Sequence, residues 1–316
     1  MRGGRRRLAA AVALLVVAAC AAPRPPAATW QAAQLAGEDA QRRGDLARAA
    51  DEYRRAIDAA EHLGAQDVRL AQSLDALGAV ALAEGRPAEA EPLLRRALGI
   101  TQTALGPEHP TVARELAVLG ELYKGAGRYA DAEPLLARVV AITERRRGPE
   151  DPEVARQLNN LGTLYYAEGR YEDAEPLLHR ALGIAERKLG PDHPDTAQTL
   201  TSLGVLYVAQ ARYAEAEPLL RQALAIDERA LGRESPAVAA NLTNLALLFG
   251  AQRRYADAEL LYRRALAIEE QALGADHPGV ALILENYSRM LRQANRPAEA
   301  DRVAARARAI RARATP

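Results

Sequence analysis

A short phrase recurs through this sequence at a constant interval of 42 residues. It reads Gly-Arg-Pro at residues 85–87 and Gly-Arg-Tyr at residues 127–129 and 169–171. Variants continue in the same register at residues 211–213, 253–255 and 295–297, and a divergent first copy lies at residues 44–46. Seven copies therefore fill residues 30–313. Such a period predicts a stack of similar supersecondary units, each of which contacts only its neighbours.

Each copy predicts two helices joined by a tight turn. In the fourth copy, two apolar stripes at helical spacing flank a Glu-Gly-Arg turn at residues 168–170. Small residues recur where the two helices must touch, as at Gly162, Ala174 and Ala181. A larger side chain at these positions would force the helices apart. The chain is therefore predicted to be all-α.

The connections between copies are as regular as the copies. A glycine follows the second helix, and a proline opens the next helix four residues later. We expect the glycines to adopt a left-handed cap conformation and the prolines to occupy the first helical turn, where a missing N–H is harmless. The glycines are Gly106, Gly148, Gly190, Gly232 and Gly274, and the prolines are Pro110, Pro152, Pro194, Pro236 and Pro278.

Three of the five histidines occupy one repeat position. His109, His193 and His277 precede the helix-opening proline, and Asp151 and Ser235 hold the same place in the intervening copies. Metal ligands must converge within a few ångströms, whereas successive copies of a stacked repeat are separated along its axis. Interchange with Asp and Ser instead indicates a residue that caps the next helix. No metal site is predicted.

The N-terminus has the pattern of an export signal. Residues 1–7 are basic, residues 8–19 are apolar or small, and the run is too short to span a membrane as a helix. The only cysteine follows in Val17-Ala18-Ala19-Cys20, which resembles the lipobox of bacterial lipoproteins. A buried structural cysteine is the alternative. We therefore expect a signal peptide at residues 1–19, a lipidated Cys20 and a Pro- and Ala-rich tether over residues 20–29.

The repeated phrases resemble a known family. The small-residue spacing and the Gly-Arg-Tyr turn look like tetratricopeptide repeats, and the phrases LNNLG, AEPLL, RAL and LGPDHP resemble the kinesin light chain subtype. The likeness covers nearly all of residues 30–313. It implies a right-handed superhelical solenoid of seven helix-turn-helix repeats. The last repeat is expected to act as a cap, because Arg308 stands where other copies carry an apolar residue.

The resemblance also implies where a ligand would bind. In this family the first helix of each repeat lines a concave groove, and asparagines on it hold a peptide backbone. The matching position carries Asn160, Asn244 and Asn286. Neighbouring groove-facing positions carry Arg114, Lys124, Arg156, Asn159, Tyr166, Arg289 and Arg292. The alternative is that the asparagines bond to the adjacent helix and the charges form a solvated face.

Charge and motifs narrow the function further. Without Arg2, Arg5, Arg6 and Arg7, the 42 basic residues become 38 against 41 acidic ones, so the mature chain has no excess of positive charge for nucleic acid. No phosphate loop, nucleophile elbow or paired-cysteine motif occurs, and we expect no catalysis, cofactor or small-molecule substrate.

The sequence therefore predicts an exported adaptor that is lipid-anchored in the bacterial cell envelope. In bacterial lipoproteins, an Asp after the lipidated cysteine retains the protein in the inner membrane. Ala21 follows Cys20 here, so the resemblance leaves the outer membrane open as a destination. Basic residues outnumber acidic ones at the groove positions, so the expected ligand is an extended peptide or protein segment with some acidic character. The alternative is a structural subunit of an envelope complex that docks by its convex face or by the edges of its repeats.

Overall fold

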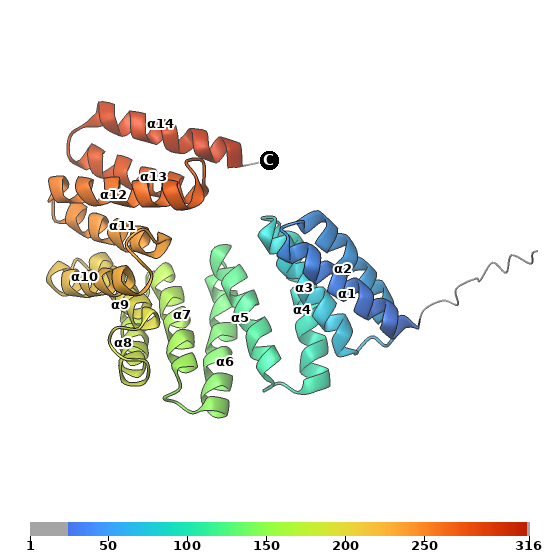
Figure 1. Ribbon diagram of the computed structural model, residues 1–316. Coiled ribbons are helices and arrows are strands. Elements are labelled where there is room, and N and C mark those ends of the chain that lie inside the picture. The colour runs from blue at the N-terminus through green and yellow to red at the C-terminus, as the bar shows by residue number, and fades with distance from the viewer. Residues whose placement is uncertain (1–24, 315–316) are drawn as a thin grey trace, which may run out of the picture. The chain divides into compact units, whose positions relative to one another are not determined.

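The computed structural model describes residues 25–314, and all of their regular structure is helical (Figure 1). Within this range fourteen helices pair into seven hairpins, which confirms the predicted all-α repeat fold. The helices are α1 Pro26–Arg42, α2 Leu46–Glu61, α3 Val68–Ala83, α4 Pro87–Leu105, α5 Pro110–Gly125, α6 Tyr129–Arg147, α7 Pro152–Glu168, α8 Tyr171–Lys188, α9 Pro194–Ala209, α10 Tyr213–Ala230, α11 Pro236–Ala251, α12 Tyr255–Leu273, α13 Pro278–Gln293 and α14 Pro297–Ala314.

The chain divides into two compact units, the first ending at Ile100 and the second beginning at Thr101, within α4. In the first unit α2 packs against both α1 and α3. In the second unit each even-numbered helix from α6 to α12 packs between the odd-numbered helices that precede and follow it, and α14 packs on α13. Helices α7, α9, α11 and α13 also contact one another in succession. We call the surface of these four helices the odd-helix face.

Helix α1 begins before the boundary that the sequence suggested. The expected tether extended to residue 29, but residues 26–29 form the first turn of α1. Pro26 occupies the first helical position, where its fixed φ favours a helix. The carbonyl oxygen of Pro25 accepts hydrogen bonds from the amides of Ala28 and Thr29 at 2.9 and 3.1 Å. The predicted signal peptide and Cys20 lie outside the described residues. Among the helices of residues 25–314, none has the length and apolar character needed to span a bilayer.

Close contact between the helices of a hairpin depends on small side chains, as predicted. Ala174 and Ala181 have no exposed surface. A Cβ atom added to Gly162 would lie 2.8 Å from Cγ of Leu178, closer than carbon atoms can approach. The leucine therefore fills the space that the glycine leaves. These contacts bury a core made mainly of Ala and Leu.

The residues before the helix-opening prolines cap the helices, which confirms the prediction made for them. Each side chain accepts a hydrogen bond from the backbone amide two residues further on. The distances are 3.2 Å at His109, 2.8 Å at Asp151, 3.1 Å at His193, 3.3 Å at Ser235 and 3.1 Å at His277. Each cap satisfies one of the N–H groups that a helix start leaves without a partner.

The five glycines between copies have positive φ, as expected for left-handed caps, but two of them are not left-handed helical. Gly148 has φ 89° and ψ 155°, and Gly274 has φ 92° and ψ 153°. A left-handed helical residue has ψ of about 47°. These two glycines instead have an extended backbone with positive φ, a conformation that is essentially restricted to glycine. It turns the chain away from the helix directly after the last helical residue. The left-handed conformation occurs in the hairpin turns, as at Gly169 with φ 80° and ψ 8°.

Candidate functional site

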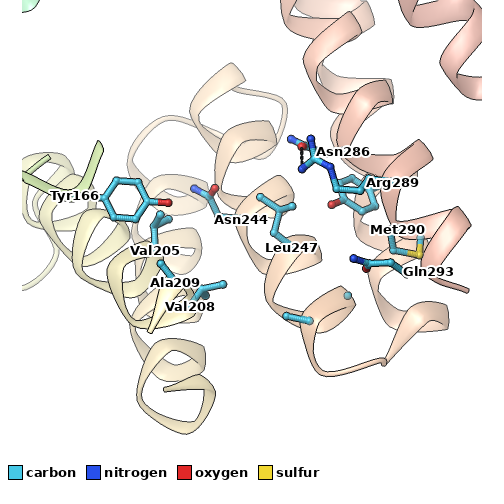
Figure 2. Close-up of a pocket in the computed structure, with 13 residues that line it drawn as sticks. Tyr166, Val205, Val208, Ala209, Asn244, Leu247, Asn286, Arg289, Met290 and Gln293 are labelled. Carbon is cyan, nitrogen blue, oxygen red and sulfur yellow. Dashed lines mark hydrogen bonds between the residues drawn. The ribbon is translucent and has the colours of Figure 1, made fainter. Parts of the chain in front are cut away.

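A cavity of about 280 Å³ opens on the odd-helix face of the second unit (Figure 2). Residues of α7, α9, α11, α12 and α13 line it, so four successive hairpins contribute. The lining residues are Tyr166, Val205, Val208, Ala209, Asn244, Leu247, Gly250, Ala251, Tyr262, Asn286, Arg289, Met290 and Gln293.

The cavity exists because one repeat position changes size along the chain. Tyr166, Val208, Gly250 and Arg292 stand 42 residues apart and occupy the same place on successive odd-numbered helices. Glycine at residue 250 removes the side chain that the other copies project from this place. A Cβ atom there would meet only Cγ of Met290, at 3.4 Å. The space beside Gly250 therefore stays open between the neighbouring helices.

The structure brings four of the predicted groove residues to this cavity. They are Tyr166, Asn244, Asn286 and Arg289. Asn244 lies between Tyr166 on one side and the Asn286–Arg289 pair on the other (Figure 2). The Nη1 atom of Arg289 donates to Oδ1 of Asn286 at 3.2 Å. The carboxylate of Glu285, next to this pair in sequence, accepts hydrogen bonds from Arg311 at 2.9 and 3.1 Å.

The predicted residues of the fourth copy lie outside the cavity. Asn160 is half-buried, and its Nδ2 atom lies 3.4 Å from Oε1 of Gln157 in its own helix. Arg156 is paired with Glu153, and Asn159 is buried at 4% exposure. Arg156 and Asn159 line a pocket of only about 10 Å³ between α7, α8 and α9. The larger cavity therefore does not extend to these residues.

The other predicted cations also lie away from the cavity. Lys124 forms an ion pair with Glu121 at 2.6 Å, and Arg292 forms one with Asp301 at 3.1 Å. Arg114 is an exposed residue of α5. Of the predicted basic residues, Arg289 is the one that lines this cavity.

Sequence reasoning missed the apolar wall and Tyr262. Val205, Leu247 and Met290 form the wall, and they occupy ordinary apolar positions of amphipathic helices. The ring of Tyr262 stacks on that of Tyr287 with centroids 5.4 Å apart and planes at 25°. Burial strongly raises the pKa of the Tyr262 phenol. A signal for this residue was present, since the equivalent places of the four preceding copies all hold leucine: Leu94, Leu136, Leu178 and Leu220.

No group of three or more His, Cys, Asp or Glu side chains within residues 25–314 is arranged to hold a metal ion. The histidines that recur with the repeat are engaged as helix caps. The cavity presents three side-chain amides, one guanidinium, two tyrosines and an apolar wall, and such a combination is typical of a binding site.

The sequence matches the family model of the tetratricopeptide repeat in six overlapping segments. They are residues 31–103, 69–145, 114–182, 153–229, 209–271 and 237–313. No curated protein is detectably similar in sequence.

Solved structures of the same fold include proteins of the kinesin light chain type. The putative kinesin light chain of P. anserina, with nearly identical repeats of tetratricopeptide type, is 28% identical, with 66% of this chain and 99% of that chain covered and a TM-score of 0.52. BtubC (BKLC) from P. vanneervenii is 23% identical over 72% of this chain and 91% of that chain, with a TM-score of 0.56. The Rap conjugation gene regulator of plasmid pLS20, solved with the Phr* peptide, is 15% identical over 90% and 74%, with a TM-score of 0.61.

Proposed function

Because this chain belongs to the tetratricopeptide repeat family, we propose that it is an adaptor that binds an extended segment of a partner protein in the cavity of the odd-helix face. The observation that carries the proposal is the convergence of Asn244, Asn286 and Arg289 beside an apolar wall. A side-chain amide can donate to and accept from an extended main chain at once, as backbone recognition requires. The wall supplies contact area for the side chains of the segment.

The fold is known to hold peptides. The pLS20 regulator was solved with a peptide bound, and its likeness to this chain extends to the fold. We propose the same class of ligand here, an extended peptide segment, on the strength of the cavity in this chain. The acidic character that we infer for the segment rests on Arg289, the lining cation.

We further propose that the adaptor is exported and anchored in the cell envelope by a lipid at Cys20. Support comes from the basic and apolar stretches at the N-terminus and from the small residues Val17, Ala18 and Ala19 before the single cysteine. Such an anchor would hold the binding cavity close to a membrane surface, where a partner of the same envelope complex is concentrated.

The proposal is tested by crosslinking and mass spectrometry of the full chain in solubilised envelopes. We compare wild type with a variant carrying both Asn244→Ala and Asn286→Ala. Gln271→Ala is the matched control, because it removes an exposed amide from α12 that does not line the cavity. The double variant should lose the partner that wild type and Gln271→Ala retain. A partner held equally by all three would instead dock on another surface, as a structural subunit of an envelope complex would.

A further inference from the structure

The hydroxyl of Tyr262, in α12, is a buried polar group beside the cavity. The side chain is fully buried, and its Oη atom has no hydrogen-bond partner within the described residues. Tyr262 also lines the cavity. A hydroxyl that is buried without a partner destabilises a fold, so native proteins rarely keep one without a reason.

The hydroxyl is a departure from the repeat. Four preceding copies place leucine here, and leucine fills the space beside the first helix without any polar atom. The first copy also has a tyrosine, Tyr53, but its hydroxyl donates to Oε1 of Gln41 at 2.8 Å. Core packing at this position therefore does not need a hydroxyl. Where one occurs in the first copy, the protein itself supplies the acceptor.

Arg289 provides the second donor at the same place. Arg289 lines the same cavity as Tyr262 (Figure 2), and its positive charge lowers the pKa of the Tyr262 phenol against the larger effect of burial. One of its N–H groups is engaged by Asn286, and the neighbouring carboxylate of Glu285 is engaged by Arg311. A guanidinium carries five N–H donors, so the bond to Asn286 leaves other N–H groups of Arg289 available to a ligand. The cavity thus combines spare donors with a positive charge, and it lacks an anionic acceptor.

We propose that the cavity receives a carboxylate of the bound segment, which accepts hydrogen bonds from Tyr262 and Arg289. The inference rests on the proposed function and specifies the group that anchors the segment. A carboxylate is the group in proteins that accepts from several donors while carrying the negative charge that a guanidinium favours. The apolar wall of Val205, Val208, Leu247 and Met290 then contacts the aliphatic part of the segment beside that carboxylate.

The test uses a synthetic library of random nonapeptides with amidated C-termini, selected on the full-length chain. Peptides that bind should share an acidic residue at one position. Replacing that residue by its amide, Asp by Asn or Glu by Gln, should weaken binding about tenfold in fluorescence anisotropy, as loss of a charge-assisted hydrogen bond would. Tyr262→Phe and Arg289→Gln should each weaken the acidic peptide to a similar extent and remove its advantage over the amide. Free-acid versions of the same peptides show whether a terminal carboxylate serves instead of a side chain.

Stability provides the second readout, with Tyr53→Phe as the matched control. Tyr262→Phe removes a hydroxyl without a partner, so the melting temperature should rise while affinity falls. Tyr53→Phe removes a bonded hydroxyl, so the melting temperature should fall while affinity is unchanged.

A fall in melting temperature for Tyr262→Phe would mean that the hydroxyl already has a hydrogen-bond partner in the free protein, and it would overturn the inference. Peptides that depend on Asn244 but bind Tyr262→Phe as tightly as wild type would also overturn it, while leaving the proposed function intact. Failure to select any peptide would overturn both.

Discussion

The guanidinium of Arg212 lies 3.9 Å from the centre of the Tyr207 ring and joins two successive hairpins. Its Nη1 atom donates to both carboxylate oxygens of Glu175, 37 residues earlier, at 2.9 and 2.8 Å. The Tyr207 hydroxyl donates to the same carboxylate at 3.1 Å. The unit recurs one copy earlier with Arg170, Tyr165 and Glu133 and one copy later with Arg254, Phe249 and Glu217. In these three copies, the arginine of the repeated turn therefore links its hairpin to the preceding one.

Replacing Arg212 by alanine should destabilise the second unit. The change removes a cation–π contact and leaves the partly buried Glu175 without its cation. Arg229→Ala is the control, because Arg229 also pairs with a residue 37 positions earlier, Asp192, but both side chains are exposed. In urea unfolding followed by circular dichroism, the midpoint should fall clearly for Arg212→Ala and little for Arg229→Ala. Equal shifts would contradict the role given to the ring and the partly buried carboxylate.

The regular parts of this fold were predictable because the repeat encodes them seven times. The 42-residue period predicted the helices, the small-residue contacts around Gly162 and the caps at His193 and its equivalents. The backbone of Gly148 was predicted less well. Its position in sequence implies positive φ, but ψ depends on how far the next helix lies from the last one, which the repeat does not reveal.

The candidate site was only partly predictable, for a different physical reason. Periodicity tells which face of a helix a residue occupies, and this was enough for Asn244 and Asn286. Whether a residue borders open space depends on the sizes of its neighbours in adjacent copies. The pocket at Asn159 is nearly closed, whereas Gly250 opens the larger one. Tyr262 was missed because a tyrosine at a core position does not show from sequence which groups or open space its hydroxyl borders.

Ala211→Gly should stabilise the protein. Ala211 has φ 59° in the hairpin turn, where the second, third and fourth copies carry glycine. A left-handed conformation costs a residue with a Cβ atom about 1–2 kcal/mol, and glycine avoids this cost. Glycine also makes the unfolded chain more flexible, which cancels part of the stabilisation. We expect a net gain of about 0.5–1 kcal/mol in the free energy of unfolding. Ala225→Gly, at an exposed position inside α10, should have the opposite sign.

Asp227→Asn should stabilise the protein at neutral pH and have less effect in acid. Burial raises the pKa of Asp227, and a hydrogen bond from Asn241 at 2.8 Å opposes the rise. Because the folded-state pKa is the higher one, the folded chain binds more protons between the two pKa values, and stability falls as pH rises through that window. Asparagine carries no charge and avoids this loss. The difference in melting temperature between variant and wild type should therefore shrink as pH falls toward the unfolded pKa of about 3.9. A difference that grows in acid would contradict the assignment.

Cys20→Ala should release the protein from the membrane. The thiol is the acceptor of the lipid in the proposed anchor, and the chain has no other cysteine to replace it. The variant should move from the membrane fraction to the soluble fraction or remain unprocessed, as judged by fractionation and N-terminal mass. Ala22→Ser, two residues beyond the cysteine, should leave both processing and fractionation unchanged. A Cys20→Ala protein that stays membrane-bound with a cut N-terminus would show that the anchor is not a lipid at this residue.

Gly250→Leu should close the cavity without unfolding the protein. The open space beside Gly250 is bordered by Met290, whose flexible side chain lies 3.4 Å from where a Cβ atom would stand. A leucine would project further and occupy the volume in which the peptide is proposed to bind. Gly250→Ala is the control at the same residue.

The single methyl group of Gly250→Ala makes an ordinary contact with Met290, and alanine favours a helix over glycine by about 1 kcal/mol. Gly250→Ala should therefore raise the melting temperature and keep peptide affinity within about threefold, a difference of less than 1 kcal/mol. Gly250→Leu should keep the helical circular dichroism spectrum and lose peptide binding. Undiminished binding to Gly250→Leu would show that the segment lies outside this cavity.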